Sequence, residues 1–463
     1  MGFFRSLIRC KSHDHAYHDH PPLKQVLSAT DLTLLGIGAI IGAGVFVLTG
    51  IASALYAGPA VVLSYIIAAI ACAFSAFSYA ELSASIGGCG SAYGYTYVGL
   101  GELMAWLIGW DLILEYGLIV STVSVGWSGY AVTALKAIGI NIPIWLCEGP
   151  LQHGIVNLPA VLIIVCVGLL LLAGTKQSAR FNNIIVTIKA AAILLFIGVA
   201  AFHFNLNNWH PFMPFGFHGV ITGAALIFFA FIGFDAVSTA AEETINPQRN
   251  LPIGIIASLA VCTVLYVAVA GLLTGIAHYT TLNNSSPVAT ALIHLGQRTA
   301  AGMISIGAIA GLTTVVMVIF FGLTRIFLAM SRDGLLPSAM AKVSPKTHTP
   351  TKVIIVAGVI MAVMAGFLPI SALAELVNLG TLAAFTLVCL SVIIMRYTKP
   401  DLKRPFRTPW SPLVPACGVA LNLYLMFSLP LITWIYFSAW AVIGLVIYFM
   451  FSRKNSILAK TAS

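Results

Sequence analysis

The segment Gly36-Ile-Gly-Ala-Ile-Ile-Gly-Ala-Gly44 decides the fold of this chain. It lies inside an apolar run that is long enough to cross a membrane, yet four of its nine residues are glycine. Glycine destabilises the interior of a helix, and backbone groups that leave a helix within a membrane must find other partners. We therefore expect a membrane-spanning helix that is interrupted at this segment.

The composition of the whole chain is that of an integral membrane protein. Of its 463 residues, 59% are hydrophobic and only 8% are charged, which excludes an ordinary soluble globular protein. Apolar runs of roughly 18 residues or more recur, and each predicts a membrane-spanning helix. The third and eighth runs are longer than a straight crossing needs, so we expect them to tilt. The twelve runs are centred near Ala43, Ala69, Ser121, Val165, Ala192, Phe231, Val264, Val316, Val359, Leu387, Leu421 and Ala441.

The net charge of +9 reflects topology and does not indicate a nucleic-acid partner. With twelve spans both termini lie on one side, and all but three of the 23 lysines and arginines fall on that side. The exceptions are Lys136 and Arg298 on the opposite side and Lys189 within a span. The positive-inside rule then predicts a multi-pass protein of the cell (inner) membrane with both termini in the cytoplasm.

The apolar runs divide into two related halves. The sixth run contains Phe228-Phe-Ala-Phe-Ile-Gly-Phe-Asp235, which places a glycine and an acid at mid-membrane depth. Interrupted helices at corresponding positions of two halves predict an inverted repeat with a binding site between them. We expect a cytoplasmic tail over 1–29, a membrane domain over 30–452 and a second cytoplasmic tail over 453–463. Within the domain, repeat one covers about 30–205, repeat two about 218–396, and two extra helices about 412–452.

The first break offers both kinds of backbone group to a ligand. N–H groups of an unwound Gly42-Ala43-Gly44 suit a carboxylate, and carbonyls of Ile40 and Ile41 suit an ammonium group. A zwitterionic amino acid presents both groups. A dinucleotide fingerprint is excluded because no strand precedes the glycines and their spacing is wrong. Close helix packing through Gly38 and Gly42 remains an alternative.

The second break adds further backbone groups and a carboxylate. Carbonyls of Phe231, Ile232 and Phe234 would complete the ammonium site, and the Phe231 ring would close over the ligand. Phe231 can also be an ordinary core or lipid-facing aromatic residue. A mid-membrane carboxylate costs roughly 2.5–3.5 kcal/mol on insertion scales, so Asp235 is expected to have a structural task. We expect it to accept hydrogen bonds from the free backbone N–H groups of the broken helix.

Lys189 is the cationic side chain that the pattern places deep within a span. Arg180 lies nine residues earlier, which puts Lys189 roughly 13 Å further into the membrane along a helix. This depth is near the limit of snorkelling, which is the alternative reading. A lysine removed from water can exchange a proton near physiological pH. The protonated amine would bridge the fifth span to the carbonyls of the broken first span, in the place of a bound sodium ion.

Two carboxylates lie four residues apart in Gly109-Trp-Asp-Leu-Ile-Leu-Glu-Tyr116, so Asp111 and Glu115 share a helix face. Asp111 falls near an interface and is assigned a structural or gating role. Glu115 lies deeper, where it either exchanges the proton of Lys189 or makes a satisfied bond between helices.

Another acidic pair, Glu242 and Glu243, ends the sixth span on the cytoplasmic side. We expect this pair to form a gate by pairing with Arg249 or a neighbouring loop, or else to be a solvated helix end. The outer loop before the eighth span contains the segment 286–294. We expect this segment to form an amphipathic helix over the site.

Histidine and cysteine give no clear metal site. The eight cysteines are scattered singly, as small apolar residues are. The segment Ser12-His-Asp-His-Ala-Tyr-His-Asp-His20 has four histidines; it either binds metal or is a solvated tail, and we favour the tail. We expect no metal and no cofactor other than a coupling proton.

Several segments together resemble the amino acid–polyamine–organocation superfamily of transporters, and within it the bacterial members of the cationic amino acid transporter branch. They span most of the chain in the family's order. The segments are Gly36–Phe46, Gly109–Tyr116, Gly126-Trp-Ser-Gly-Tyr130, Gly233-Phe-Asp235, Ala241-Glu-Glu-Thr-Ile-Asn-Pro247 and Ala329-Met-Ser-Arg-Asp-Gly-Leu-Leu-Pro337.

The resemblance implies an all-α, LeuT-like fold of twelve transmembrane helices, a five-plus-five inverted repeat with discontinuous helices 1 and 6 and two extra helices. It also implies that Ala43 and Gly44 bind the substrate carboxylate, that the amino group lies near Ile40 and Phe231, and that Lys189 marks proton coupling. Residues of the eighth span would line the side-chain pocket, with Phe320 or Met317 as the candidates.

The expected function is import of L-amino acids across the bilayer by proton symport and alternating access. A phenylalanine at position 320 leaves little room, and the eighth span has no carboxylate for a guanidinium, so we favour small or medium neutral amino acids. Uptake of cationic amino acids, or exchange of amino acids or polyamines, remains the alternative. A membrane enzyme is disfavoured because none of the eleven histidines lies beside a suitable catalytic partner outside the segment 12–20. The sequence leaves the oligomeric state open.

Overall fold

The computed structural model describes residues 9–11, 24–88, 90–137, 139–150, 154–284, 286–367, 370–427, 429 and 431–461. Within these ranges the chain is helical, and its one β-type contact is an isolated bridge between Leu27 and Thr244. The all-α prediction is therefore confirmed. The histidine-rich segment 12–20 lies outside the described residues.

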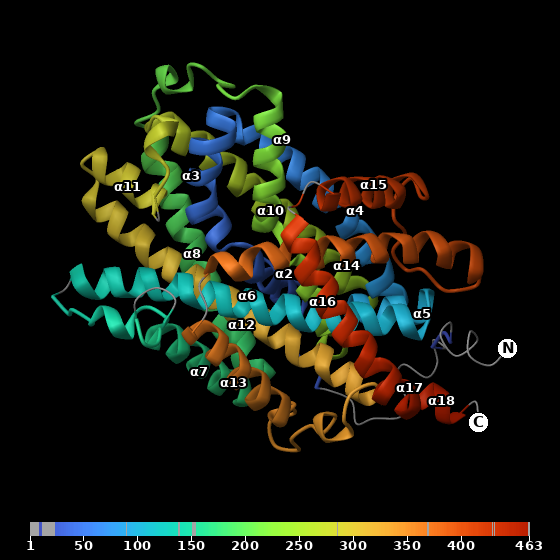
Figure 1. Cartoon of the computed structure of the whole chain (residues 1–463). Helices are drawn as coiled ribbons and strands as arrows, with labels where there is room; N and C mark the ends of the chain where they lie inside the picture. Colours follow the sequence, from blue (N-terminus) through green and yellow to red (C-terminus); the bar gives the residue numbers. More distant parts are fainter. Residues whose placement is uncertain are drawn as a thin grey trace.

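The helices are joined by connections of different lengths (Figure 1). The first half contains α2 (Ala29–Ile40), η2 (Gly44–Leu48), α3 (Thr49–Ala52), η3 (Ser53–Ala57), η4 (Gly58–Ala60), α4 (Val61–Ser85), α5 (Ala92–Gly99), α6 (Glu102–Ala137), η5 (Ile144–Leu146), α7 (Leu158–Leu172) and α8 (Thr175–Ala201). The second half begins with η7 (Leu206–Trp209), α9 (Gly216–Ile227), η8 (Phe228–Phe231), η9 (Phe234–Glu243), α10 (Pro247–Ile276), η10 (Tyr279–Thr281), α11 (Pro287–His294) and α12 (Arg298–Arg332). It ends with η11 (Ser338–Met340), α13 (Thr351–Phe367), α14 (Ile370–Thr398), α15 (Leu413–Phe427), α16 (Leu431–Ile447), η12 (Tyr448–Ser452), α17 (Arg453–Asn455) and α18 (Ile457–Thr461).

The described helices are those of a membrane protein. Eight helical segments are long and apolar enough to cross a bilayer, and four shorter apolar helices accompany them. The centres of the predicted apolar runs fall in these helices, except that Ala43 lies just after the first break and Phe231 just before the second. Helices α6 and α12 have 36 and 35 residues, which at 1.5 Å per residue exceeds the roughly 30 Å hydrocarbon core.

The first predicted break is present but begins slightly earlier than the sequence indicated. Helix α2 starts with a capping box in which Ser28 and Asp31 bond each other's backbone N–H groups, and it ends at Ile40. Ile41 is extended (φ −76°, ψ 98°), and helical dihedrals resume at Ala43 (φ −56°, ψ −25°) before the π-helix η2. The interruption therefore lies at Ile41 and Gly42, and Gly44 already belongs to the next helix.

The second predicted break lies at Ile232 and Gly233, between the two 3₁₀ segments η8 and η9. Ile232 is extended (φ −59°, ψ 138°) and Gly233 has φ +121°, a conformation that only glycine adopts readily. A Cβ at Gly233 would also lie 2.8 Å from the Cβ of Ala39. Glycine is therefore required at position 233 both by its dihedral angle and by the close approach of α2.

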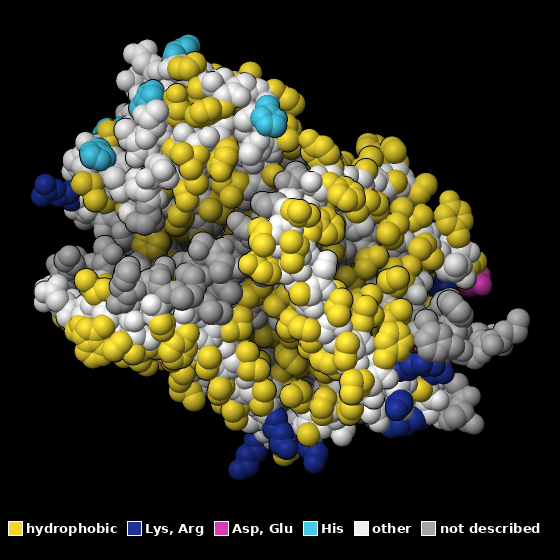
Figure 2. All heavy atoms as spheres, in the orientation of Figure 1, with side chains coloured by type: hydrophobic (Ala, Val, Ile, Leu, Met, Phe, Trp, Pro, Cys, Tyr) yellow, Lys and Arg dark blue, Asp and Glu magenta, His cyan; other side chains and the backbone are white. Residues whose placement is uncertain are grey.

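Packing brings the two breaks to the centre of the molecule. Helix α10 packs along α2 and α4, and α12 packs along α6 and α8. The described ends of the chain meet on one side, because the Lys11 Nζ atom lies 2.5 Å from Asp333 Oδ1 and the Ile457 N–H donates to the Asp333 carbonyl at 3.1 Å. On the face shown in Figure 2, Lys and Arg gather mainly towards that end and His at the opposite end.

The predicted outer helix is present as α11. It lies beside α3 at the end of the molecule opposite α17 and α18 (Figure 1). Gly50 of α3 contacts this region closely, since a Cβ there would lie 2.5 Å from the Leu282 carbonyl oxygen and from Pro287 Cβ.

Candidate functional site

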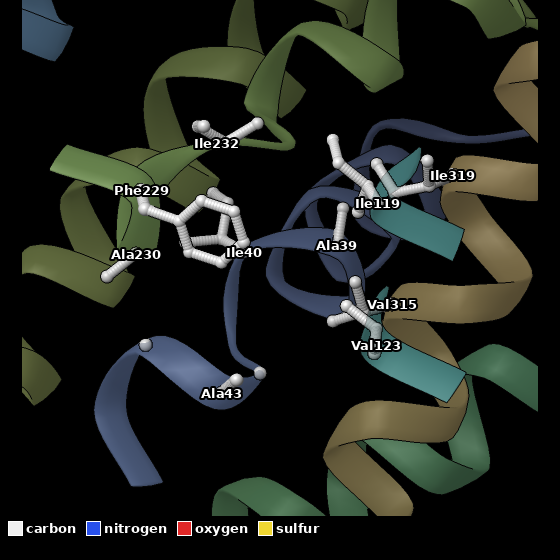
Figure 3. Close-up of a pocket in the computed structure, with 12 residues that line it drawn as sticks. Ala39, Ile40, Ala43, Ile119, Val123, Phe229, Ala230, Ile232, Val315 and Ile319 are labelled. Atoms are coloured by element: carbon white, nitrogen blue, oxygen red, sulfur yellow. The ribbon is translucent and has the colours of Figure 1, made fainter. Parts of the chain in front are cut away.

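The two breaks and two long helices enclose a small pocket (Figure 3). None of the side chains that line this pocket is polar. The cavity volume is about 20 Å³, enough for about one water molecule. The lining consists of Ala39, Ile40, Gly42, Ala43, Gly44, Ile119, Val123, Phe229, Ala230, Ile232, Val315 and Ile319.

The pocket depends on a close approach between the two broken segments. A Cβ added at Gly44 would lie 2.3 Å from the Cβ and 2.6 Å from the Cα of Ala230. No side chain fits there, so the start of η2 touches η8 directly. Because the first N–H groups of a helix lack intrahelical partners, the backbone around Gly42–Gly44 presents donors at this point.

The carbonyls at the first break already have protein partners. The Tyr266 hydroxyl donates to the Ile40 carbonyl at 2.7 Å and lies 3.1 Å from the Ala230 carbonyl oxygen. The Ile41 carbonyl accepts from Lys189. The Tyr65 hydroxyl donates to the Gly44 carbonyl at 3.2 Å. Neither tyrosine was predicted from the sequence, although a hydroxyl in an apolar span indicates a buried hydrogen-bond partner.

Phe231 belongs to an aromatic cluster beside the breaks. Its ring is fully buried, with its centroid 6.1 Å from that of Tyr65 and 5.3 Å from that of Tyr266. Phe234 is equally buried and packs against Tyr79 and Phe385. Both rings therefore support the broken helix from the side, while Ile232 contributes to the lining itself.

Lys189 is fully buried and points at the first break. Its Nζ atom donates to the Gly38 and Ile41 carbonyls, each at 3.0 Å, and to Thr314 Oγ1 at 2.8 Å. These three acceptors match the three donors of an ammonium group. The side chain thus joins α8 to α2 and α12, and it does not snorkel to the surface. Thr314 was not identified from the sequence.

Asp235 binds the backbone of its own broken helix. The Gly233 N–H donates to Asp235 Oδ1 at 3.2 Å, and the Tyr116 hydroxyl donates to Oδ2. The carboxylate is 1% exposed. This arrangement fixes the turn after Ile232, as the sequence indicated for this residue.

Asp111 and Glu115 face α14, and neither forms a hydrogen bond or ion pair with Lys189 within the described chain. Glu115 Oε1 lies 2.5 Å from Thr381 Oγ1. Asp111 lies against Gly380, where a Cβ would be 2.5 Å from Asp111 Oδ1.

The acidic pair at the end of η9 pairs with α12. Glu243 Oε1 lies 2.7 Å from Arg325 Nη2, with both side chains 2% exposed, and Glu242 Oε2 lies 2.7 Å from Arg332 Nη1. The predicted partner Arg249 is instead exposed. These ion pairs tie the end of the second broken helix to the end of α12.

The eighth-span candidates Phe320 and Met317 are not among the residues that line this pocket. The Phe320 ring contacts Gly168 of α7 and Gly358 of α13, and Met317 lines a separate small cavity near Leu35. Val315 and Ile319, four residues apart on one face of α12, line the pocket instead. Position 320 is rotated by about 100° from position 319, which turns it away from the pocket.

A family model and several known proteins that resemble this chain all indicate one family of membrane transporters. A family model described as amino acid permease matches residues 27–452. A methylthioribose transporter of Bacillus subtilis (strain 168) is 50% identical over 440 residues, covering 95% of each chain. The branched-chain amino acid permease BcaP of the same strain is 50% identical over 441 residues, covering 94% of this chain and 95% of the relative. The vacuolar cationic amino acid transporter 4 of Arabidopsis thaliana is 38% identical over 408 residues, covering 86% of this chain and 68% of the relative.

Proposed function

Because the chain belongs to the amino acid permease family, we propose that it imports small or medium neutral L-amino acids by proton symport and alternating access. Family membership makes the chain a transporter and not an enzyme. The proposal further includes a LeuT-like arrangement of twelve spans as two inverted repeats plus two helices, with cytoplasmic termini in the cell membrane. The observation that carries the substrate assignment is the pocket between the breaks, where the backbone of Gly42–Gly44 lies among apolar side chains.

The backbone of the pocket supports binding of the zwitterion. The N–H groups around Ala43 and Gly44 would receive the carboxylate. The ammonium group would approach the carbonyls of the second break and the free lone pairs of Ile40 and Ile41, because each carbonyl oxygen can accept two hydrogen bonds. A cavity of about 20 Å³ does not hold an amino acid, so the lining has to move apart on binding.

The walls support a neutral apolar side chain. Ile119 and Val123 of α6 lie with Val315 and Ile319 of α12 on the side of the pocket opposite Phe229 and Ala230 (Figure 3). No described lining residue carries a carboxylate for a cationic substrate, and none offers a polar side chain for sugar hydroxyls, whose burial without partners is costly. We therefore favour branched-chain amino acids, as the name of the second relative states for that protein.

Lys189 supports the proton coupling. In its charged form it holds the Gly38 and Ile41 carbonyls and Thr314 at once, which fixes α2 between α8 and α12. Loss of the proton removes the charge and one donor, so the hydrogen bonds from Lys189 to α2 weaken. Proton release and movement of α2 are linked in this scheme, and a sodium ion is not needed.

Uptake by reconstituted vesicles tests the proposal. Leucine, isoleucine, valine, alanine, arginine and methylthioribose would be compared under an inward proton gradient, a sodium gradient and an internal substrate load. We expect uptake of the branched-chain amino acids that follows the proton gradient and ignores sodium. Sodium-dependent uptake, or uptake only against internal substrate, would overturn proton symport. Preference for arginine or methylthioribose would overturn the substrate assignment.

A further inference from the structure

Helix α8 holds α2 at a second point that the proposed mechanism does not use. The Asn182 Nδ2 atom donates to the Leu34 carbonyl at 3.1 Å, two helical turns before Lys189 reaches the Ile41 carbonyl at 3.0 Å. Asn182 is 1% exposed and Lys189 is fully buried. Because both pairs of residues are seven positions apart, the two helices are joined at levels about 10 Å apart.

Gly38 connects these two levels. A Cβ at Gly38 would lie 2.5 Å from Asn182 Oδ1, so the amide of Asn182 rests directly on this glycine. The Gly38 carbonyl is at the same time an acceptor of Lys189 Nζ. The position of this carbonyl relative to Lys189 therefore depends on where Asn182 holds α2.

The amide of Asn182 is not explained by packing alone. Its Oδ1 atom is buried and has no hydrogen-bond partner within the described structure. A buried polar atom without a partner costs free energy, which an apolar side chain of similar size would avoid. What the amide supplies in return is the donor to Leu34, which fixes the rotation and height of α2.

We propose that Asn182 is a positioning residue for the proton site, because it holds the Gly38 and Ile41 carbonyls where Lys189 needs them. This inference rests on the proposed role of Lys189 as the proton carrier. Without the Asn182 bond, α2 shifts more freely against α8 and the ammonium group loses part of its acceptors. The protonated form is then less stable, and transport needs a more acidic outer solution.

The surroundings of Lys189 add little that would compete with this effect. The contacting groups on α2 and α12 are neutral carbonyls and the Thr314 hydroxyl. On α10, Cys262 is the titratable group that acts on Lys189 within the described chain. Asn183, beside Asn182, bonds Asp31 at the cytoplasmic end of α2 at 2.6 Å and does not reach the lysine level.

The test measures the pH at which uptake is half-maximal in vesicles. Asn182→Leu keeps the number and branching of the side-chain heavy atoms and removes the donor, and Asn182→Ala removes both the shape and the donor. We expect both variants to lower the half-maximal pH by about one unit, a tenfold loss of proton affinity. The KM for substrate in exchange should stay within about twofold at a pH that keeps the proton site filled, because Asn182 is not part of the pocket lining. Thr187→Ala, an exposed hydroxyl on the same helix, is the matched control and should leave both values unchanged.

A double-variant cycle separates positioning from a loss of folding. Gly38→Ala should reduce proton-driven uptake because its methyl group displaces the Asn182 amide, while Gly38→Ala in the Asn182→Ala background should add no further loss. An unchanged half-maximal pH in Asn182→Leu would overturn the inference, as would losses that simply add in the double variant.

Lys189→Ala distinguishes the two proposals. If Lys189→Ala retains proton-driven uptake, the proposed coupling fails; if it loses that uptake while Asn182→Leu behaves as wild type, only the positioning role fails.

Discussion

Replacement of Ile319 tests which residues of α12 contact the substrate side chain. Ile319 is 1% exposed and lines the pocket, whereas its neighbour Phe320 contacts Gly168 and Gly358 on other helices. Ile319→Val removes one methylene equivalent from the wall and Ile319→Ala removes three. Shortening this residue should therefore weaken small branched substrates and admit larger ones, in proportion to the carbon atoms removed.

The size of the effect follows from buried apolar surface. At about 0.8 kcal/mol per buried methylene, Ile319→Val removes at most ~0.8 kcal/mol of contact with leucine, and Ile319→Ala at most ~2.4 kcal/mol. Since 1.4 kcal/mol is a factor of ten, the ceilings are about fourfold and about 60-fold in kcat/KM. Phenylalanine, which we expect the wild-type walls to exclude, should gain more uptake in Ile319→Ala than in Ile319→Val.

The assay compares two substrates in one vesicle preparation. The ratio of leucine to phenylalanine uptake cancels any loss of active protein, which matters because truncating a buried isoleucine to alanine typically costs about 2–5 kcal/mol of stability. Phe320→Ala is the matched control, since it should lower stability by about 3–5 kcal/mol without changing that ratio. A changed ratio in Phe320→Ala with an unchanged ratio in Ile319→Ala would refute the pocket geometry.

Three further variants test the other contacts at the breaks. Lys189→Met should abolish proton-driven uptake while substrate exchange persists in vesicles; full pH-driven uptake would contradict the proton role. Glu243→Gln leaves Arg325 buried without its ion pair and should lower stability by about 3–5 kcal/mol in thermal unfolding, with much of the loss recovered in Glu243→Gln/Arg325→Met. No recovery in the double variant would show that the pair itself is not the cause. Tyr266→Phe removes a neutral hydrogen bond to the Ile40 carbonyl, which is worth about 0.5–1.5 kcal/mol. The KM for substrate, measured by competition uptake, should therefore rise severalfold. An unchanged KM would show that this hydroxyl does not contribute to binding.

Polar residues in apolar spans were the most predictable part of the site. Each one has to find a partner in the membrane, so its presence indicates a specific contact. Asp235 was expected to bind the free backbone of its helix, and it accepts the Gly233 N–H. Lys189 was expected to reach the carbonyls of the first break, and it contacts two of them. In both cases the partner lies at a break that glycine had already marked.

The choice of helix face was not predictable from this sequence. In a soluble protein the polar face of a helix indicates its rotation, but a membrane helix is apolar towards both lipid and core. The run Val315–Phe321 therefore gives no sign that Ile319 faces the pocket while Phe320 faces α7 and α13. Partners from distant helices were missed for a related reason, because the pairing of Glu243 with Arg325 depends on how η9 and α12 pack.

The first break unites the contacts that any transport cycle of this protein has to coordinate. Within the four residues Gly38–Ile41, carbonyl groups receive donors from Lys189 of α8, Thr314 of α12 and Tyr266 of α10. Ala39 and Ile40 of the same stretch line the pocket. A substrate that displaces this backbone must therefore change the acceptors of Lys189, and a change in the charge of Lys189 must alter the pocket wall. Because these four residues are shared, the proposed substrate binding and proton exchange would be thermodynamically linked, and linkage of this kind is reciprocal.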